Sequence, residues 1–201
     1  MVTVTGETTR REQILEAALV AFLDHGLAGA SIEEICVGSG ASVGSVYHHF
    51  GGKEGLAGAL YLDSLADYQL TFLTALRAHD DDAEAGVRAV VRAHLRWCLG
   101  DRPERARFLL FHGAAVPGAS VEALKAANRE FFGVVLAWWR PHARDGTLRE
   151  LELDVAYALW LGPAQEFCRL HVAGRNNVPP DRAAPLLADG AWQALNPRGD
   201  P

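Results

Sequence analysis

The sequence predicts an all-α protein, with an N-terminal helix-turn-helix domain at residues 1–52 and a larger C-terminal helical domain at residues 53–201. Three observations support this fold class. Apolar residues recur every three or four positions through most of the chain. Alternating strand patterns are nearly absent. Two short helical segments before residue 52 are separated by a tight glycine turn.

Capping signals define the helices of the first domain. A Thr or Ser three residues before a Glu is the pattern of a capping box, and it occurs at residues 9–12 and again at 31–34. Gly26 is expected to end the first helix, and Ser42 is a suitable N-cap for the third. The three helices are therefore predicted near 9–25, 31–37 and 42–50.

Longer amphipathic segments follow in the second domain, which holds all five tryptophans of the chain. Turn residues separate these segments, and Pro103 and Pro180 stand at first-turn positions. Pro163 lies inside one segment and is expected to kink its helix. The predicted helices lie near 53–77, 82–100, 103–115, 120–143, 152–173 and 180–195.

Composition excludes several classes of protein. The hydrophobic content of 49% supports a real core. The three cysteines are scattered, which argues against a disulfide framework and suits a reducing cytoplasm. The N-terminus does not resemble a secretory signal, and no apolar run reaches the length of a membrane span, so we expect a cytoplasmic protein with no membrane partner.

The stretch GSGASVGSVYHHF, residues 38–50, imitates two other motifs. A dinucleotide-binding glycine loop needs a preceding strand, but a capped helix precedes this one. A P-loop needs Ser or Thr after its lysine, and Glu54 stands there. His48 and His49 are adjacent and would point about 100° apart on a helix, which does not suit one metal ion. The sequence indicates no metal site and no cofactor.

A helix-turn-helix fits the same stretch better. Gly40 can adopt the left-handed conformation of the turn. Val46 and Phe50, four residues apart, would face the core. The outer face would then carry small and hydrogen-bonding residues, which a helix needs to approach and contact DNA. These outer residues are Gly44, Ser45, Tyr47 and His48.

From about Arg10 to Leu60 the chain resembles the DNA-binding segment of the TetR family of transcriptional regulators. The resemblance rests on SIEEICVGSGASVGSVYHHFGGKEGLAGAL. It implies a ligand-responsive repressor, a homodimer released from a palindromic double-stranded DNA operator by a small-molecule effector. The implied DNA contacts are Ser31, Ser42, Val43, Gly44, Ser45, Tyr47, His48, His49 and Lys53.

Two features temper the expected DNA binding. Many relatives carry a long polar or basic residue where this chain has Val43, which cannot donate a hydrogen bond and could only touch a thymine methyl group or a sugar. Residues 1–53 hold three formal positive charges and six negative ones, a balance of −3. We therefore expect modest non-specific affinity and a shallow salt dependence.

Aromatic residues of the second domain are expected mainly to pack its core. The resemblance adds that several line an effector cavity, with His112 or Glu166 as a polar anchor. The candidate lining residues are Trp97, Phe108, Phe111, His112, Phe131, Trp138, Trp160, Glu166 and Phe167.

The helices near 152–173 and 180–195 are the expected dimer interface. The segment LWLGPAQEFCRLHVAGR, residues 159–175, is similar to a helix near the dimer seam of many such regulators. Ala156, Leu159, Leu187 and Ala191 are small or apolar enough for a two-fold seam, although they also suit an intramolecular face.

One pair of residues in the second domain has two possible interpretations. Cys168 and His171 share a helix face, which could make a thiol–imidazole pair or half of a metal site, but structural packing is the favoured interpretation because no third partner is visible.

Two other classes of protein are the alternatives to a DNA-binding regulator. Neither a nucleophile elbow nor an HExxH pattern is found, so the protein is predicted not to be an enzyme. A purely structural helical bundle is the other alternative, and it would not need the outward-facing residues of the third helix.

Overall fold

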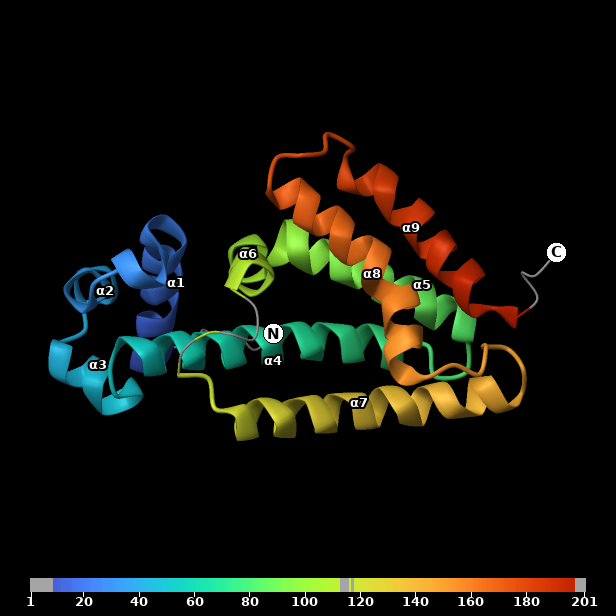
Figure 1. Cartoon of the computed structure of the whole chain (residues 1–201), viewed down its shortest axis with the longest axis horizontal. Helices are drawn as coiled ribbons and strands as arrows, with labels where there is room; N and C mark the ends of the chain where they lie inside the picture. The colour runs from blue at the N-terminus through green and yellow to red at the C-terminus, as the bar shows by residue number, and fades with distance from the viewer. Residues whose placement is uncertain (1–8, 113–115, 117, 198–201) are drawn as a thin grey trace, which may run out of the picture. The chain divides into compact units, whose positions relative to one another are not determined.

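The structure is a computed structural model that describes residues 9–112, 116 and 118–197. Within them the backbone forms nine α-helices, one π-helix and no strand, which confirms the predicted all-α fold (Figure 1). The helices are α1 (Arg10–Gly29), α2 (Ile32–Ser39), α3 (Val43–Phe50), α4 (Lys53–Arg77), α5 (Ala83–Arg96), the π-helix η1 (Trp97–Asp101), α6 (Pro103–His112), α7 (Val121–Arg144), α8 (Leu153–Val172) and α9 (Pro180–Leu195).

Contacts divide the chain into two compact units. The N-terminal unit comprises the described residues of Met1–Ser64 and Phe108–Leu124, and the C-terminal unit comprises Leu65–Arg107 and the described residues of Lys125–Pro201. Helix α4 contributes to both units, with its residues up to Ser64 in the first. The domain boundary placed between residues 52 and 53 stays a prediction.

The N-terminal unit buries one apolar face from each of its first four helices. Phe22 of α1, Ile35 of α2, Val46 of α3 and Leu60 of α4 are all at most 1% exposed. Phe108 of α6 joins this core, since its ring stacks on Phe22 with 6.2 Å between the ring centroids. Burial of large apolar side chains of this kind contributes about 1.5–3 kcal/mol each.

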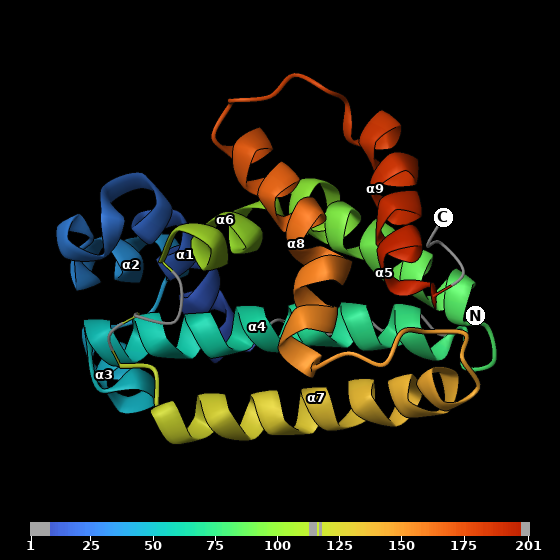
Figure 2. The same ribbon diagram turned by 45° about the vertical axis from the view of Figure 1, so that its right-hand side comes forward.

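Aromatic rings form the centre of the C-terminal unit. Trp160 of α8 is 2% exposed and lies against the rings of Phe72, Trp138 and Trp139. Its indole Nε1 donates a hydrogen bond to the Val87 carbonyl of α5 at 3.0 Å, so the buried polar atom is satisfied. Helices α5, α8 and α9 pack together around this centre (Figure 2).

Three helices differ in detail from their predicted ranges. Gly26 has a φ of 71° and kinks α1, but the helix resumes for a short turn to Gly29 instead of ending. The helix expected to reach residue 100 is α-helical only to Arg96 and continues as η1. The helix predicted over 103–115 is seen to His112, and residues 113–115 lie outside the described ones.

The internal proline of α8 has the expected setting. Pro163 lies inside the helix, and the ribbon of α8 changes direction along its length in both views (Figures 1 and 2). In the part of the chain that is described, none of the helices is both long and apolar enough to cross a membrane.

Candidate nucleic-acid interface

Two capped helices and a left-handed glycine form the helix-turn-helix. The Ser31 hydroxyl accepts the Glu34 N–H at 3.1 Å at the start of α2, and the Ser42 hydroxyl accepts the Ser45 N–H at 3.1 Å at the start of α3. Gly40 has a φ of 65°, so the turn favours glycine there. In a complete capping box the Glu34 carboxylate would accept the Ser31 backbone N–H. Here this carboxylate instead lies 2.9 Å from His25 Nε2, with which it forms an ion pair when His25 is protonated.

Helix α3 has one buried face and one exposed face. Val46 is fully buried and Phe50 is half-buried, as the spacing predicts. Val43 is 44% exposed and Tyr47 is 55% exposed. Of the other residues expected to contact DNA, Ser45 and Lys53 are half-buried, and the exposed ones are Ser31, Ser42, Gly44, His48 and His49.

The position of α3 is fixed by close backbone contact with α4. A Cβ atom at Gly55 would overlap the Phe50 carbonyl oxygen, so only glycine allows this approach. The guanidinium of Arg11 lies 5.7 Å from the centre of the Phe50 ring, at the distance of a cation–π contact. Arg10 donates to the Ser39 carbonyl at 3.1 Å, next to the turn. These contacts hold the exposed face of α3 in one orientation.

Lys53 is engaged within the unit. Its ammonium donates to the Ala28 carbonyl at 2.9 Å and to the Ala30 carbonyl at 3.0 Å. Both carbonyls lie where α1 ends, so the first residue of α4 ties the two helices together. This structural role was not foreseen from the sequence, because the partners are more than twenty positions away.

The structure packs most of the candidate effector residues into its interior. Trp97, Phe131, Trp138 and Trp160 are buried in the C-terminal unit, while Phe108 belongs to the N-terminal unit. Trp138 also lines a cavity of about 390 Å³ together with Leu76, Arg77, Asp80, Val134, Ala137 and Pro141.

The remaining candidates lie elsewhere. The exposed Glu166 carboxylate forms a bidentate pair with Arg169, at 2.6 and 2.7 Å, which lowers the pKa of Glu166. Half-buried Phe167 stacks on the His171 ring. The side chains of Phe111 and His112 lie outside the described ones.

Cys168 meets partners that the sequence analysis missed. His171, which shares its helix face, hydrogen-bonds Asn176 through Nδ1 at 2.9 Å, so the thiol–imidazole pair considered for these two residues is not formed. Cys168 instead lies beside Cys98 of η1 and His94 of α5, with one donor atom of each residue within 4.8 Å of the others. A hydrogen bond from the Cys98 thiol lowers the pKa of Cys168. The four-residue spacing of His94 and Cys98 was the available signal.

Comparisons with known proteins agree with the helix-turn-helix. Residues 14–60 match the model of bacterial regulatory proteins of the tetR family. The HTH-type transcriptional regulator BetI 2 of Chromohalobacter salexigens is 30% identical over 125 residues, which cover 61% of this chain and 59% of that protein. The repressor AcnR of Corynebacterium glutamicum is 41% identical over 59 residues, covering 29% of this chain and 31% of that one. Both alignments span less than two thirds of the relative's own length.

The fold of the whole chain also has solved counterparts. A TetR family transcription regulator from Marinobacter aquaeolei VT8 superposes with a TM-score of 0.77 over 92% of this chain and 95% of that one, at 20% identity. At this identity the likeness shows the fold alone. The fold and site define an all-helical protein with an N-terminal helix-turn-helix. The chain is thus similar to the bacterial regulatory proteins of the tetR family through residues 14–60, which contain its helix-turn-helix and make up less than half of its length.

Proposed function

We propose that this protein is a transcriptional repressor that binds a palindromic operator through α3 and leaves it when a small molecule binds. The main observation behind the proposal is the exposed face of α3. This helix is the second of the helix-turn-helix; Ser42 caps its start, and its opposite face buries Val46. A helix of this kind is the element that enters the major groove in helix-turn-helix proteins.

The chemistry of the exposed face suits close approach with few cations. Gly44 has no side chain to hold the helix away from the groove. Tyr47, His48 and His49 supply hydroxyl and ring groups for phosphates and base edges. Since Lys53 already binds two carbonyls, a phosphate contact from its ammonium would compete with them. The proposed complex therefore has a shallow salt dependence.

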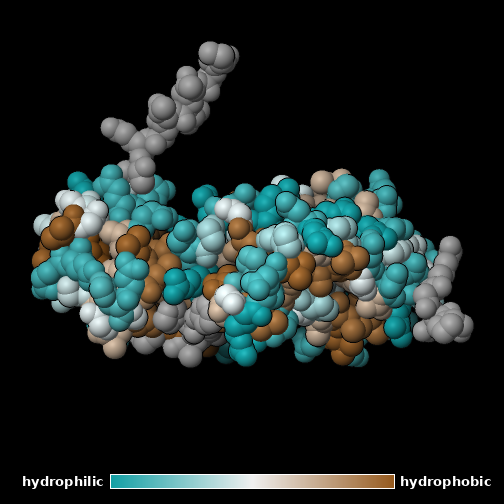
Figure 3. Space-filling view, turned by 90° about the horizontal axis from the view of Figure 1, so that it is seen from above, coloured by the Kyte–Doolittle hydropathy of each residue, from teal (hydrophilic) through white to brown (hydrophobic). Residues whose placement is uncertain are grey.

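A second copy of the chain would pair through α8 and α9. Ala156 and Ala191, which were expected in this seam, are buried inside the subunit and cannot face a partner. The same helices carry exposed Val155 and Leu186, which are 48% and 71% exposed. Figure 3 shows hydrophobic patches among hydrophilic residues on one face of the molecule. Two-fold symmetry would match half-sites about 34 Å apart.

The effector is proposed to bind in the C-terminal unit. The cavity beside Trp138 has a volume within the range of small-molecule sites, and Arg77 and Asp80 offer it polar contacts. Helix α4 carries Arg77 near its end and Lys53 at its start, so it offers a continuous element for communication. The coupling free energy in such proteins is about 1–3 kcal/mol. A regulator of this type works where the chromosome is, which places it in the cytoplasm.

An electrophoretic mobility shift assay tests the proposal. DNA fragments from the neighbourhood of the protein's own gene would be titrated with the full chain at low salt, with unrelated DNA as competitor. The proposal predicts a competitor-resistant shift of one fragment and its loss on addition of one compound class from a library. If no fragment shifts while the protein is folded, a structural helical bundle becomes the better interpretation.

A further inference from the structure

A cluster of three side chains of types that can bind metals lies inside the C-terminal unit, and none of the three lines the proposed effector cavity. His94, Cys98 and Cys168 come from α5, η1 and α8, and they are 4%, 2% and 0% exposed. Within the described residues they form the only group of three such side chains whose donor atoms converge. Buried cysteine alone is ordinary core packing, so the case depends on the geometry around the imidazole.

The imidazole of His94 is oriented as a metal ligand would be. The Tyr68 hydroxyl lies 2.9 Å from His94 Nδ1, and the two rings meet edge-on. Nε2 faces the other way, 3.7 Å from the Cys98 sulfur. Metal-binding histidines commonly bond their second ring nitrogen to an outer partner, which fixes the ring and leaves one nitrogen for the ion. A thiol is only a weak partner for a buried ring nitrogen.

The distances fit a single ion. Zinc binds sulfur at about 2.3 Å and imidazole nitrogen at about 2.0–2.1 Å, which puts two ligands of one ion about 3.5–4.0 Å apart. The 3.7 Å between Nε2 of His94 and the sulfur of Cys98 lies inside this interval. The ligand atoms of all three residues lie within 4.8 Å of one another, so the Cys168 sulfur needs only a short movement to enter the coordination sphere of the same ion.

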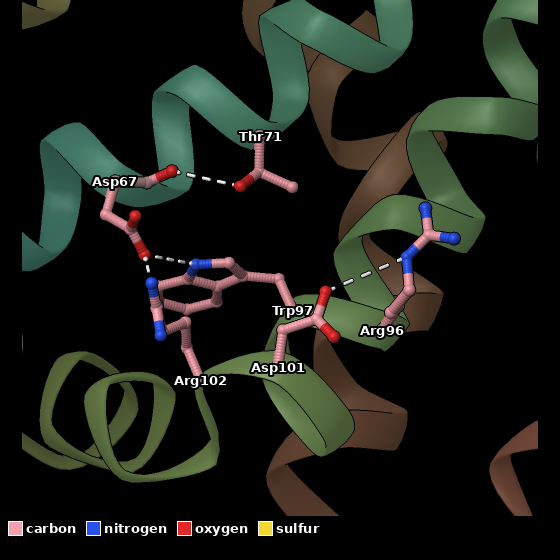
Figure 4. Close-up of polar contacts among 6 residues, drawn as sticks. All are labelled: Asp67, Thr71, Arg96, Trp97, Asp101 and Arg102. Carbon is pink, nitrogen blue, oxygen red and sulfur yellow. Dashed lines mark hydrogen bonds and ion pairs between the residues drawn. The ribbon is translucent and has the colours of Figure 1, made fainter. Parts of the chain in front are cut away.

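The local backbone places and holds Cys98. A π-helical turn changes the register of side chains, and such turns often occur at functional sites. Figure 4 shows how η1 is tied to α4: the Asp67 carboxylate accepts a hydrogen bond from Trp97 Nε1 at 2.9 Å and another from Arg102 Nε at 3.3 Å. These contacts flank Cys98 on both sides in sequence, so its position is supported independently of any metal.

We propose that His94, Cys98 and Cys168 bind one thiophilic divalent ion, Zn²⁺ in first place, with Tyr68 as the positioning residue. On binding, each thiol transfers its proton to the solvent and forms a sulfur–metal bond, while the neutral imidazole donates its lone pair. Two thiolates balance the two positive charges, which a buried site requires because an uncompensated charge is costly there. The fourth position is left to a water or another small donor.

Direct metal titration of the full chain tests the site. Reduced, metal-free protein would be titrated with Zn²⁺ against a chromophoric chelator, with Mg²⁺ as a hard-ion control and Cu⁺ as a second thiophilic ion. We expect one Zn²⁺ per chain and none of the Mg²⁺. Cys98→Ser and Cys168→Ser should each abolish this binding, whereas Cys36→Ser should retain it because Cys36 lies outside the cluster. Tyr68→Phe should weaken it by about 10–100-fold.

A spectroscopic experiment tests the site without changing either cysteine of the buried cluster. Co²⁺ added to the Cys36→Ser protein should produce thiolate-to-cobalt charge-transfer absorption, since Cys98 and Cys168 are then the only cysteines left. Absence of these bands, or Zn²⁺ binding that survives loss of both cluster cysteines, would overturn the site. Stoichiometric Cu⁺ binding without Zn²⁺ binding would overturn the divalent assignment.

Discussion

The ammonium of Lys53 donates a hydrogen bond to the Ala28 carbonyl at 2.9 Å and thereby joins the start of α4 to the end of α1. A residue that the family resemblance assigns to the DNA backbone thus also holds the N-terminal unit together. Since α4 approaches α3 closely at Gly55, a change at Lys53 is expected to affect both folding and DNA binding.

Replacing Lys53 separates these two roles. Lys53→Met should lower the free energy of unfolding by about 1–2 kcal/mol, because two carbonyls lose a charged donor. Thermal unfolding monitored by circular dichroism measures this effect, and Lys125→Met, at an exposed lysine of α7, serves as the control. An unchanged melting temperature combined with weaker DNA binding would show that the ammonium acts on DNA alone.

Val43 tests the orientation of α3. Its 44% exposure leaves room for a longer side chain, so Val43→Lys should fold normally, raise non-specific DNA affinity and steepen the slope of log K against log salt by about one per protomer. Val20→Lys adds the same charge on α1 at a residue that is 59% exposed. The account of the α3 face fails if both variants have the same slope, measured by fluorescence anisotropy.

Two helical glycines should respond in opposite ways to alanine. A Cβ at Gly58 of α4 would overlap the Gly118 backbone, whereas a Cβ at Gly133 of α7 would meet no atom within 4 Å. Gly58→Ala should therefore destabilise the protein, and Gly133→Ala should stabilise it by about 0.5–1 kcal/mol through helix propensity. Denaturant titration of both variants provides the comparison; stabilisation by Gly58→Ala would exclude the tight backbone crossing.

The proposed dimer face can be tested with one charge. Leu186 of α9 is 71% exposed, so Leu186→Glu should preserve the fold but convert a dimer to a monomer, since a buried unpaired carboxylate is costly at an interface. Leu70→Glu, at a leucine that is 62% exposed on α4, is the matched control. Sedimentation velocity distinguishes monomer from dimer. If the Leu186→Glu variant remains a dimer, the interface lies on another surface.

Local sequence patterns predicted most of the fold. Ser42 caps α3, Gly40 turns left-handed and Val46 is buried, because caps, turns and amphipathic spacing depend on a few neighbouring residues. The exposed side of α3 follows from the same periodicity. Neither the partners of Lys53 nor the meeting of Cys98 with Cys168 could be derived in this way, since both depend on tertiary packing.

In the effector region, residue type alone was not enough to predict which side chains line a cavity. Nine residues were selected largely for aromatic character, yet Trp160 packs among other rings and Phe108 joins the core of the N-terminal unit. An aromatic side chain on a helix has the same sequence signal whether it lines a cavity or fills it. The π-helix at Trp97–Asp101 likewise continues the helical periodicity, so the sequence did not distinguish it from α-helix.

The operator affinity of a Gly44→Leu variant tests most directly the claim that α3 enters DNA. Gly44 is exposed and its nearest neighbouring atom would be 3.9 Å from an added Cβ, so leucine should fit and increase helix stability. Anisotropy titration of the fragment found in the mobility shift assay should show a loss of roughly tenfold or more, equivalent to about 1.4 kcal/mol, with no loss of thermal stability. Wild-type affinity in a folded Gly44→Leu protein would contradict the account.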